Sequence, residues 1–286
     1  MTPAAALIAL HVAVALFGFA GLFGKWLAWD PAAIVFGRTI VAAIVLGLVS
    51  LVRRSERRGP TFALAGNGLI LAVHWVAFFA AIQVSTVAIG LLGFASFPLF
   101  VIVLERWLLG VRWRGPEAIT ALLVVAGLAL LVPEFTLADR TVQGLAWGML
   151  SALTFAWLTV RNRALGNARP AMTVALWQNA FAALCVAPLL FRPGGPVVDI
   201  TPTTLALVLI LGAVCTALAH TLFIASLSRL SAHTASVVTA LESVYGIVLA
   251  AMLLAEIPDA RTCFGGALLV GAAIVASSRA AWPADT

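Results

Sequence analysis

Apolar stretches, each close to the length of a membrane-crossing helix, follow one another along almost the whole chain. Because about 20 helical residues cross a hydrocarbon core about 30 Å thick, this pattern predicts ten transmembrane helices. The expected helices cover residues 5–25, 32–52, 63–83, 86–104, 116–132, 141–160, 171–190, 203–226, 232–253 and 262–279.

The breaks between these stretches contain residues that end helices. They include Asp30-Pro31, Gly115-Pro116, Arg169-Pro170 and the run RRSERRGP at 53–60. Inside the fourth stretch, Gly90, Gly93 and Pro98 favour a bend that would expose backbone carbonyls to a cavity. Small residues also allow close helix packing, and both interpretations stay open.

Composition supports a membrane protein. Hydrophobic residues make up 63% of the chain and charged residues 10%, whereas soluble domains carry roughly 25% charged residues. We therefore predict an all-α membrane protein embedded in a lipid bilayer. The net charge of +6 would suggest a nucleic-acid partner in a soluble protein. Here the cations lie in short gaps between apolar stretches, so we expect no nucleic-acid partner. The three cysteines lie inside apolar stretches without a disulfide or metal pattern, and we expect no metal, no cofactor and no obligate protein partner.

The distribution of cations predicts the orientation. Twelve lie on one side of the ten predicted helices: Arg53, Arg54, Arg57, Arg58, Arg106, Arg112, Arg114, Arg161, Arg163, Arg169, Arg229 and Arg279. Four lie on the other side: Lys25, Arg140, Arg192 and Arg261. This asymmetry predicts a bacterial inner-membrane protein with both termini in the cytoplasm.

The two halves of the chain resemble each other. A shift of 145 positions matches residues 108–127 with 253–272, and a shift of 138 matches Phe17-Gly18 with Phe155-Ala156. Further pairs under the first shift are Trp75 with His220, Phe78 with Phe223, Ala80 with Ala225 and Thr86 with Ser231.

Each half holds five predicted helices, and the odd number inverts the second half in the membrane. We predict two five-helix repeats, residues 1–135 and 136–286, related by a pseudo-two-fold axis around a central cavity. Such inverted repeats give many transporters two similar states open to opposite sides. Shared apolar composition alone could also produce a match of this strength.

The order of several short motifs resembles the drug/metabolite transporter superfamily, in its ten-helix form with two EamA-type repeats. These motifs are Phe17-Gly18 followed by Lys25, Phe155-Ala156 followed by Arg163, Arg38 in the second stretch, Phe97-Pro98 in the fourth, LLAE at 253–256 and GGALLVGAAIV at 265–275. Val111 stands where the first repeat would often have the glutamate matched by Glu256, and phenylalanines replace the tryptophans usual in the opening motif.

Within that superfamily, His74-Trp75 and the scattered interior aromatic residues most resemble the bacterial aromatic amino-acid exporters. The resemblance implies a secondary transporter that exports aromatic and other neutral amino acids. Relatives of this architecture are also associated with drugs, sugars and other metabolites, so a broad-specificity exporter is the alternative.

Two ionisable residues stand well inside predicted helices, where a charge costs roughly 2.5 to 3.5 kcal/mol. Arg38 could grip a substrate carboxylate bidentately or could bond helix-end carbonyls. Glu242, with Tyr245 on the same helical face, could bind a substrate ammonium or carry a proton, or could remain protonated. Both are candidate substrate-binding residues.

Aromatic and polar side chains complete the predicted substrate site. His74, Trp75 and Phe78 share a helical face, although a histidine in an apolar helix is often only an interhelical hydrogen-bonding group, and the same holds for His220. Of Trp177, Gln178 and Asn179, at least one should point inward. The remaining candidates are Phe17, Phe94, Phe97, Phe155, Trp157 and Ser243.

Other function classes fit the sequence poorly. Hydrolysis would need paired acids, a metal cluster or an activated nucleophile, yet the predicted membrane interior holds one acid and neither H-E-x-x-H nor G-x-S-x-G occurs. A channel or scaffold would not predict an inverted repeat around an aromatic site. We therefore do not expect an enzyme.

Overall fold

Helices account for all regular secondary structure in the described part of the chain. The structure is a computed structural model that describes residues 1–53, 59–110, 115–131, 138–165, 168–192, 195–196 and 198–277. The helices are α1 (Pro3–Trp26), α2 (Pro31–Val52), α3 (Phe62–Val84), α4 (Val87–Phe94), α5 (Phe97–Leu109), α6 (Gly115–Leu131), α7 (Arg140–Leu165), α8 (Ala171–Leu190), α9 (Pro202–Gly212), the π-helix η1 (Ala213–Leu218), α10 (Ala219–Ser226), α11 (Ala232–Thr239), α12 (Leu241–Leu254) and α13 (Ala260–Ser277). The prediction of an all-helical protein is confirmed.

These elements form ten rod-like segments, because α4 continues into α5, α9 into η1 and α10, and α11 into α12. Among the described residues, seven segments are long and apolar enough to cross a membrane: Pro3–Trp26, Pro31–Val52, Phe62–Val84, Val87–Leu108, Ala171–Leu190, Pro202–Ser226 and Thr234–Leu254. The apolar parts of α6 and α13 are shorter. Helix α7 is less apolar because it carries polar residues such as Ser151, Thr159 and Asn162, and it buries these three. The ten segments match the ten predicted helices.

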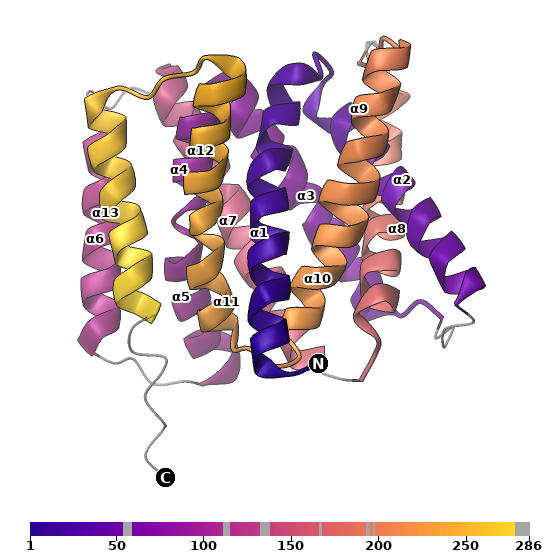
Figure 1. The fold of residues 1–286 in the computed structure, drawn as a ribbon, viewed down its shortest axis with the longest axis horizontal. Coiled ribbons are helices and arrows are strands. Elements are labelled where there is room, and N and C mark those ends of the chain that lie inside the picture. The colour runs from indigo at the N-terminus through magenta and orange to yellow at the C-terminus, as the bar shows by residue number, and fades with distance from the viewer. Residues whose placement is uncertain are drawn as a thin grey trace.

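The packing of the segments follows a pseudo-two-fold axis. Helix α1 packs against α10 and α12, and its counterpart α7 packs against α3, α4 and α5. Helices that the axis would exchange with each other also pack together, α2 on α8 and α6 on α13, and these two pairs lie at opposite edges of the bundle (Figure 1). Helix α1 begins and α13 ends at the same end of the bundle (Figure 1), as an even number of crossings requires.

The fourth and ninth segments break at equivalent points. The predicted bend lies between Phe94, the last residue of α4, and Phe97, the first residue of α5. A shift of 145 places this break on the interruption between α11 and α12. The hydroxyl groups of Thr86 and Ser231, matched by the same shift, accept hydrogen bonds from the first turns of α4 and α11.

Glycines let helices from the two halves approach closely. A Cβ atom added to Gly18 would lie 2.9 Å from the backbone oxygen of Glu242, and one added to Gly93 would lie 2.9 Å from that of Leu145. Side chains larger than hydrogen would separate α1 from α12 and α4 from α7. The broken segments are therefore held tightly against the first helix of the opposite repeat.

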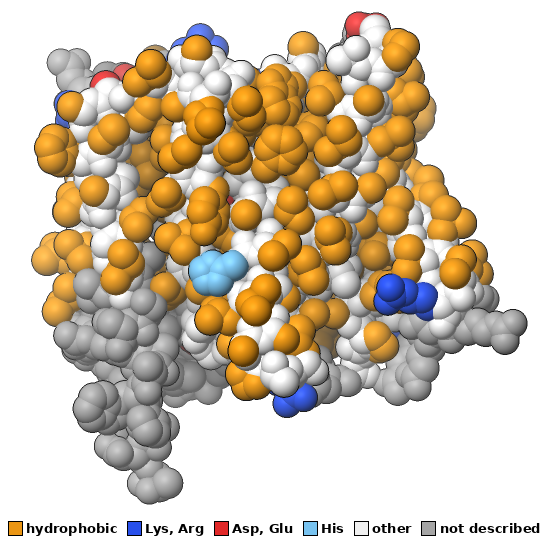
Figure 2. Space-filling view, viewed as in Figure 1, with side chains coloured by type: hydrophobic (Ala, Val, Ile, Leu, Met, Phe, Trp, Pro, Cys, Tyr) orange, Lys and Arg blue, Asp and Glu red, His pale blue; other side chains and the backbone are white. Residues whose placement is uncertain are grey.

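The outer surface of the bundle suits a lipid environment. Hydrophobic side chains cover most of the face shown in Figure 2, and Ile8, Leu48 and Leu122 are among those more than half exposed. Such a surface would be an aggregation hazard in water but is the expected one in a bilayer.

At one end of α13, Asp259 accepts a hydrogen bond from the Thr262 backbone N–H at 2.7 Å, and hydrogen bonding to Thr262 lowers the pKa of Asp259.

Candidate substrate site

Aromatic side chains occupy the centre of the bundle. The Phe155 ring is stacked on the His74 ring with centroids 4.6 Å apart, and its centroid lies 5.0 Å from that of Phe223. The rings that contact Phe155 are Phe17, His74, Phe94, Phe97 and Phe223. We call Phe155 and these five residues, together with Phe78, the aromatic cluster. Six of the predicted site residues therefore lie together with Phe223, which the repeat alignment pairs with Phe78.

Residues matched by the repeat also meet across the pseudo-two-fold axis. Phe17 and Phe155 form an edge-to-face pair with ring centroids 6.2 Å apart. Trp75 and His220 form another, with centroids 5.7 Å apart. Matched residues of the two repeats therefore contact each other at the centre of the bundle.

Arg38 is held at the edge of this centre by the eighth segment. Its side chain is 1% exposed; Nε donates to Thr216 Oγ1 at 2.9 Å and Nη2 to the Cys215 carbonyl at 3.4 Å. The guanidinium carbon lies 4.1 Å from the centroid of the Trp75 ring, in a cation–π contact. A second ring, that of Phe79, lies 5.4 Å away. The structure is compatible with both roles considered for Arg38. It bonds a backbone carbonyl, and its guanidinium also lies against the ring of Trp75, where it could bind a carboxylate.

The π-helix explains how Arg38 finds these partners. Residues Ala213–Leu218 form η1 in the middle of the eighth segment, and π-bulges are often found at functional sites. Thr216 Oγ1 donates to the Leu211 carbonyl at 2.7 Å and accepts from Arg38. Gly212 allows α2 to lie close, because an added Cβ would be 2.5 Å from Val41.

Glu242 supplies a buried carboxyl group in the same region. It lies in the first turn of α12 and is 3% exposed. Within the part of the chain that the structure describes, its carboxyl makes no hydrogen bond and no ion pair, and the charge that acts on it is that of Arg38. The N-terminal end of a helix favours a carboxylate. Arg38 and Glu242 thus provide a buried guanidinium and a buried carboxyl group in one region, and no ion pair joins them in the described part of the chain.

A second group of buried polar residues lies toward the end of the bundle where α1 begins. Gln178 Nε2 donates to Asn162 Oδ1 at 2.6 Å, and Asn67 Nδ2 donates to the same oxygen at 3.4 Å. Arg161 Nε donates to Asn67 Oδ1 at 3.2 Å. These bonds join α3, α7 and α8. Sequence analysis singled out Gln178 but missed Asn67 and Asn162. The position of Asn67 in an apolar stretch was an available signal, whereas Asn162 stands between Arg161 and Arg163.

His74, Asn179 and His220 are further buried polar residues near the aromatic cluster. His74 Nδ1 lies 2.9 Å from Ser151 Oγ. Asn179 Nδ2 donates to the Ala175 carbonyl at 2.8 Å and lies 3.3 Å from His220 Nδ1. Three buried polar atoms in this region have no hydrogen-bond partner among the described residues: Gln178 Oε1, Asn179 Oδ1 and His220 Nε2. The prediction that one of residues 177–179 points inward is met by both amides.

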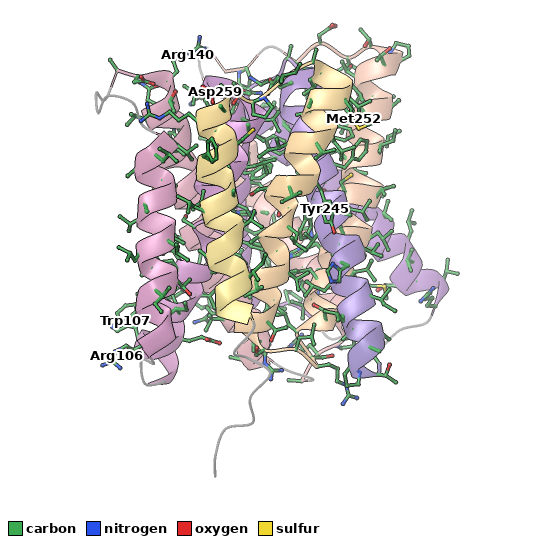
Figure 3. All side chains as sticks on the ribbon, turned by 60° about the vertical axis from the view of Figure 1, so that its left-hand side comes forward. Arg106, Trp107, Arg140, Tyr245, Met252 and Asp259 are labelled. Carbon is green, nitrogen blue, oxygen red and sulfur yellow. The ribbon has the colours of Figure 1, made fainter. Side chains whose placement is uncertain are left out.

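Besides Arg38, Trp75, Gln178 and Glu242, four more predicted site residues lie outside the aromatic cluster. Trp157 contacts Trp107, and Trp177 contacts Phe181. Ser243 is buried, donates to the Leu91 carbonyl at 2.8 Å, and borders a cavity of about 300 Å³ between α4, α12 and α13. Tyr245 projects from α12 (Figure 3) and is only partly buried.

The two ends of the bundle carry equivalent cations. Lys25, at the end of α1, donates to the Ser85 carbonyl at 2.9 Å, and its ammonium lies 3.8 Å from Glu256 Oε1. Arg163, its match under the shift of 138, donates to the Leu227 carbonyl at 2.7 Å. Each cation bonds the backbone that follows the third segment of its own repeat. Figure 3 shows Arg140 and Asp259 at the Lys25 end and Arg106 and Trp107 at the other.

Comparison with known proteins decides the family. The model of the EamA-like transporter family matches residues 4–132 and 142–278, one match in each half. The chain belongs to the EamA-like transporter family. The family places it in the drug/metabolite transporter superfamily, as the motifs predicted, and makes it a membrane transporter rather than a soluble protein.

Curated and structural relatives agree with this EamA membership. The pseudopaline exporter CntI of Pseudomonas aeruginosa is 31% identical over 259 residues, which cover 86% of either chain. The uncharacterized transporter YxxF of Bacillus subtilis is 23% identical over 268 residues, covering 91% of this chain and 85% of that protein. A crystal structure of a protein 23% identical to this EamA protein matches it with a TM-score of 0.71 over 99% of each chain, which shows the shared fold.

Proposed function

We propose that this EamA protein is a secondary transporter that exports aromatic and other neutral amino acids from the cytoplasm. The observation that carries the proposal is a buried guanidinium, that of Arg38, and a buried carboxyl group, that of Glu242, which interact electrostatically but form no ion pair among the described residues. Arg38 also lies against an aromatic ring, that of Trp75. A zwitterion offers a carboxylate to Arg38 and an ammonium to Glu242. Its side chain would lie against the rings of the aromatic cluster.

Energetics favour a functional role for these charges. Each charged group in the membrane interior costs roughly 2.5 to 3.5 kcal/mol on insertion scales, and a protein that only needed to pack would use apolar residues there. Arg38 recovers part of this cost through Thr216 and Cys215. Glu242 gains no hydrogen bond from a described residue, so a ligand or a proton is the partner that its position calls for.

Alternating access follows from the paired architecture. We propose that residues 1–135 and 136–286 act as the two inverted repeats and that the site opens in turn to each end. The excess of arginines at the end where α1 begins supports a cytoplasmic location for both termini in the bacterial inner membrane. The direction of transport, outward, is supported by the exporter among the relatives.

A broad-specificity drug or metabolite exporter is the second candidate. The aromatic cluster favours it, since rings also bind lipophilic cations through cation–π contacts, and Glu242 would then bind a cation without help from Arg38. This candidate leaves Arg38 as a structural residue bonded to η1.

A counterflow screen separates the two candidates. Purified protein in liposomes loaded with unlabelled phenylalanine should accumulate labelled phenylalanine faster than protein in empty liposomes. Neutral amino acids should compete, whereas sugars and lipophilic cations should not. Exchange driven only by lipophilic cations would favour the second candidate.

A further inference from the structure

Asn179 and His220 each keep one polar atom that no described residue satisfies. Asn179 and His220 are both at most 1% exposed, and they come from α8 and α10. One atom of each, Asn179 Oδ1 and His220 Nε2, has no hydrogen-bond partner among the described residues. Buried polar atoms are nearly always paired, so two unpaired atoms on neighbouring side chains indicate a place for a polar ligand.

The hydrogen bonds around the pair fix which atom donates. The Ala175 carbonyl, 2.8 Å away, can only accept, so the Asn179 atom facing it is the amide nitrogen. That nitrogen also faces His220 Nδ1 at 3.3 Å, which makes Nδ1 the acceptor in this contact. A neutral imidazole then carries its proton on Nε2. The unpaired atoms are therefore an acceptor, Asn179 Oδ1, and a donor, His220 Nε2–H.

The surroundings of the pair suit the polar end of an amphipathic molecule. His220 contacts Trp75 edge-on, and Trp75 also lies against the guanidinium of Arg38. Phe223, which lies in α10 three residues after His220, belongs to the aromatic cluster. A ligand with its ring in the cluster would place its polar end within reach of α8 and α10.

We propose that Asn179 and His220 add hydrogen bonds to the amino-acid head group whose charges Arg38 and Glu242 complement, an inference that rests on the proposed function. The Asn179 carbonyl oxygen accepts a hydrogen bond from the substrate ammonium, and His220 Nε2–H donates to the substrate carboxylate. One donor beside one acceptor matches a zwitterion. A ligand that has only the amine or only the carboxylate would leave one of these two protein atoms unpaired. This pair therefore selects amino acids over their decarboxylated and deaminated analogues.

The test uses three ligands that share a phenyl ring: phenylalanine, 2-phenylethylamine, which lacks the carboxylate, and 3-phenylpropionate, which lacks the ammonium. Each competes for counterflow of labelled phenylalanine in liposomes that contain the full-length protein. Asn179→Leu removes the acceptor at similar volume, and His220→Phe removes the donor while keeping a ring against Trp75. Ser226→Ala is the matched control, because its buried hydroxyl bonds only the Phe223 carbonyl of its own helix.

Each variant should remove the preference for one charged group of the substrate: Asn179→Leu that for the ammonium, and His220→Phe that for the carboxylate. In Asn179→Leu, the half-saturation concentration of phenylalanine should rise about 10- to 100-fold, the usual worth of a hydrogen bond to a charged group, while that of 3-phenylpropionate changes little. In His220→Phe, 2-phenylethylamine should be the unaffected ligand. A purely structural role would weaken all three ligands together. If melting in detergent shows that one variant does not fold, the other variant still tests its own hydrogen bond to the substrate.

The outcomes separate this inference from the proposed function. Counterflow by the parent with unchanged ligand preferences in both variants would show that the pair binds only water, and the head-group assignment would fall while the exporter proposal stands. Absence of counterflow by the parent with any amino acid would overturn both.

Discussion

The Lys25 ammonium lies 3.8 Å from a carboxylate oxygen of Glu256, and this ion pair joins the first repeat to the second at one end of the bundle. The other carboxylate oxygen accepts the Val87 backbone N–H at 2.9 Å, at the start of α4. The repeat matches Glu256 with Val111, which lies outside the described residues and cannot carry a charge. A valine at the equivalent position cannot form such an ion pair, although the two repeats resemble each other.

Neutralising Glu256 should loosen its end of the transporter. In Glu256→Gln the bond to Val87 can persist, but the ion pair, whose side chains are about a quarter exposed, is lost. Exposed pairs contribute about 0.2 to 1 kcal/mol, so the open state at this end should become up to about fivefold more populated. A cysteine at Val87, in a background without Cys185, Cys215 and Cys263, should react correspondingly faster with a membrane-impermeant maleimide.

A matched change at the opposite end controls for general loosening. Arg163→Gln removes the equivalent cation, whose described partner is the Leu227 carbonyl, and should leave the labelling of the Val87 cysteine unchanged. Equal labelling in the Glu256→Gln and parent proteins would mean that the ion pair does not restrain this end.

Arg38 and Glu242 should matter to the transport cycle more than to folding. Arg38→Gln and Glu242→Gln keep hydrogen-bonding groups while removing charge, and both variants should reach the membrane with near-normal melting in detergent. Counterflow should fall at least about tenfold in each, since a bond to a charged group is worth about 1.5 to 3 kcal/mol. Parental transport by both variants would remove these charges from the mechanism.

Thr216 should be the residue that positions Arg38. Its hydroxyl oxygen accepts from Arg38 Nε at 2.9 Å, and Thr216→Val leaves that buried donor unpaired, at a cost of about 1 to 3 kcal/mol. We expect a lower melting temperature in detergent. Thr221→Val, which removes only a bond to the Ala217 carbonyl within the same segment, should melt close to the parent; equal melting of both variants would argue against a positioning role.

Orientation can be tested independently of transport. Reporter fusions after Ser85, Asp139 and Asp199 should be periplasmic, because they follow crossings that end at the arginine-poor side. Fusions after Gly59, Gly115 and Asn167 should be cytoplasmic. The reversed pattern would place both termini outside the cytoplasm. The end of the bundle where α1 begins would then face the periplasm.

Length and hydropathy made the ten segments predictable, and proline and glycine spacing made the break before Phe97 predictable. Which way each side chain faces was harder to predict, because a helix that is hydrophobic all round carries no strong amphipathic signal. Trp157 and Trp177 illustrate this: their aromatic character favoured the centre, yet they contact Trp107 and Phe181. The π-helix around Thr216 was also not predicted, although the close approach of Val41 in α2 requires a small residue at Gly212, next to its first residue.

The aromatic cluster should give phenylalanine an advantage over leucine as a substrate. Phe155 contacts five other rings, so a guest ring that enters the cluster can replace or add to these contacts. An aromatic pair is worth about 0.5 to 1.5 kcal/mol beyond its buried area, which corresponds to a preference of roughly 2- to 13-fold per contact. Rearrangement of the rings to admit the guest reduces that preference.

Phe155→Leu should therefore narrow the difference between phenylalanine and leucine as competitors of counterflow, with tryptophan and methionine following phenylalanine. Trp157→Leu is the control, because this ring lies outside the cluster and contacts Trp107 instead, and it should keep the parental preference. If both variants discriminate as the parent does, the central rings serve packing alone. If the parent is inhibited by a lipophilic cation and by no amino acid, the cluster is a drug site, and the broad-specificity exporter becomes the better account of this protein.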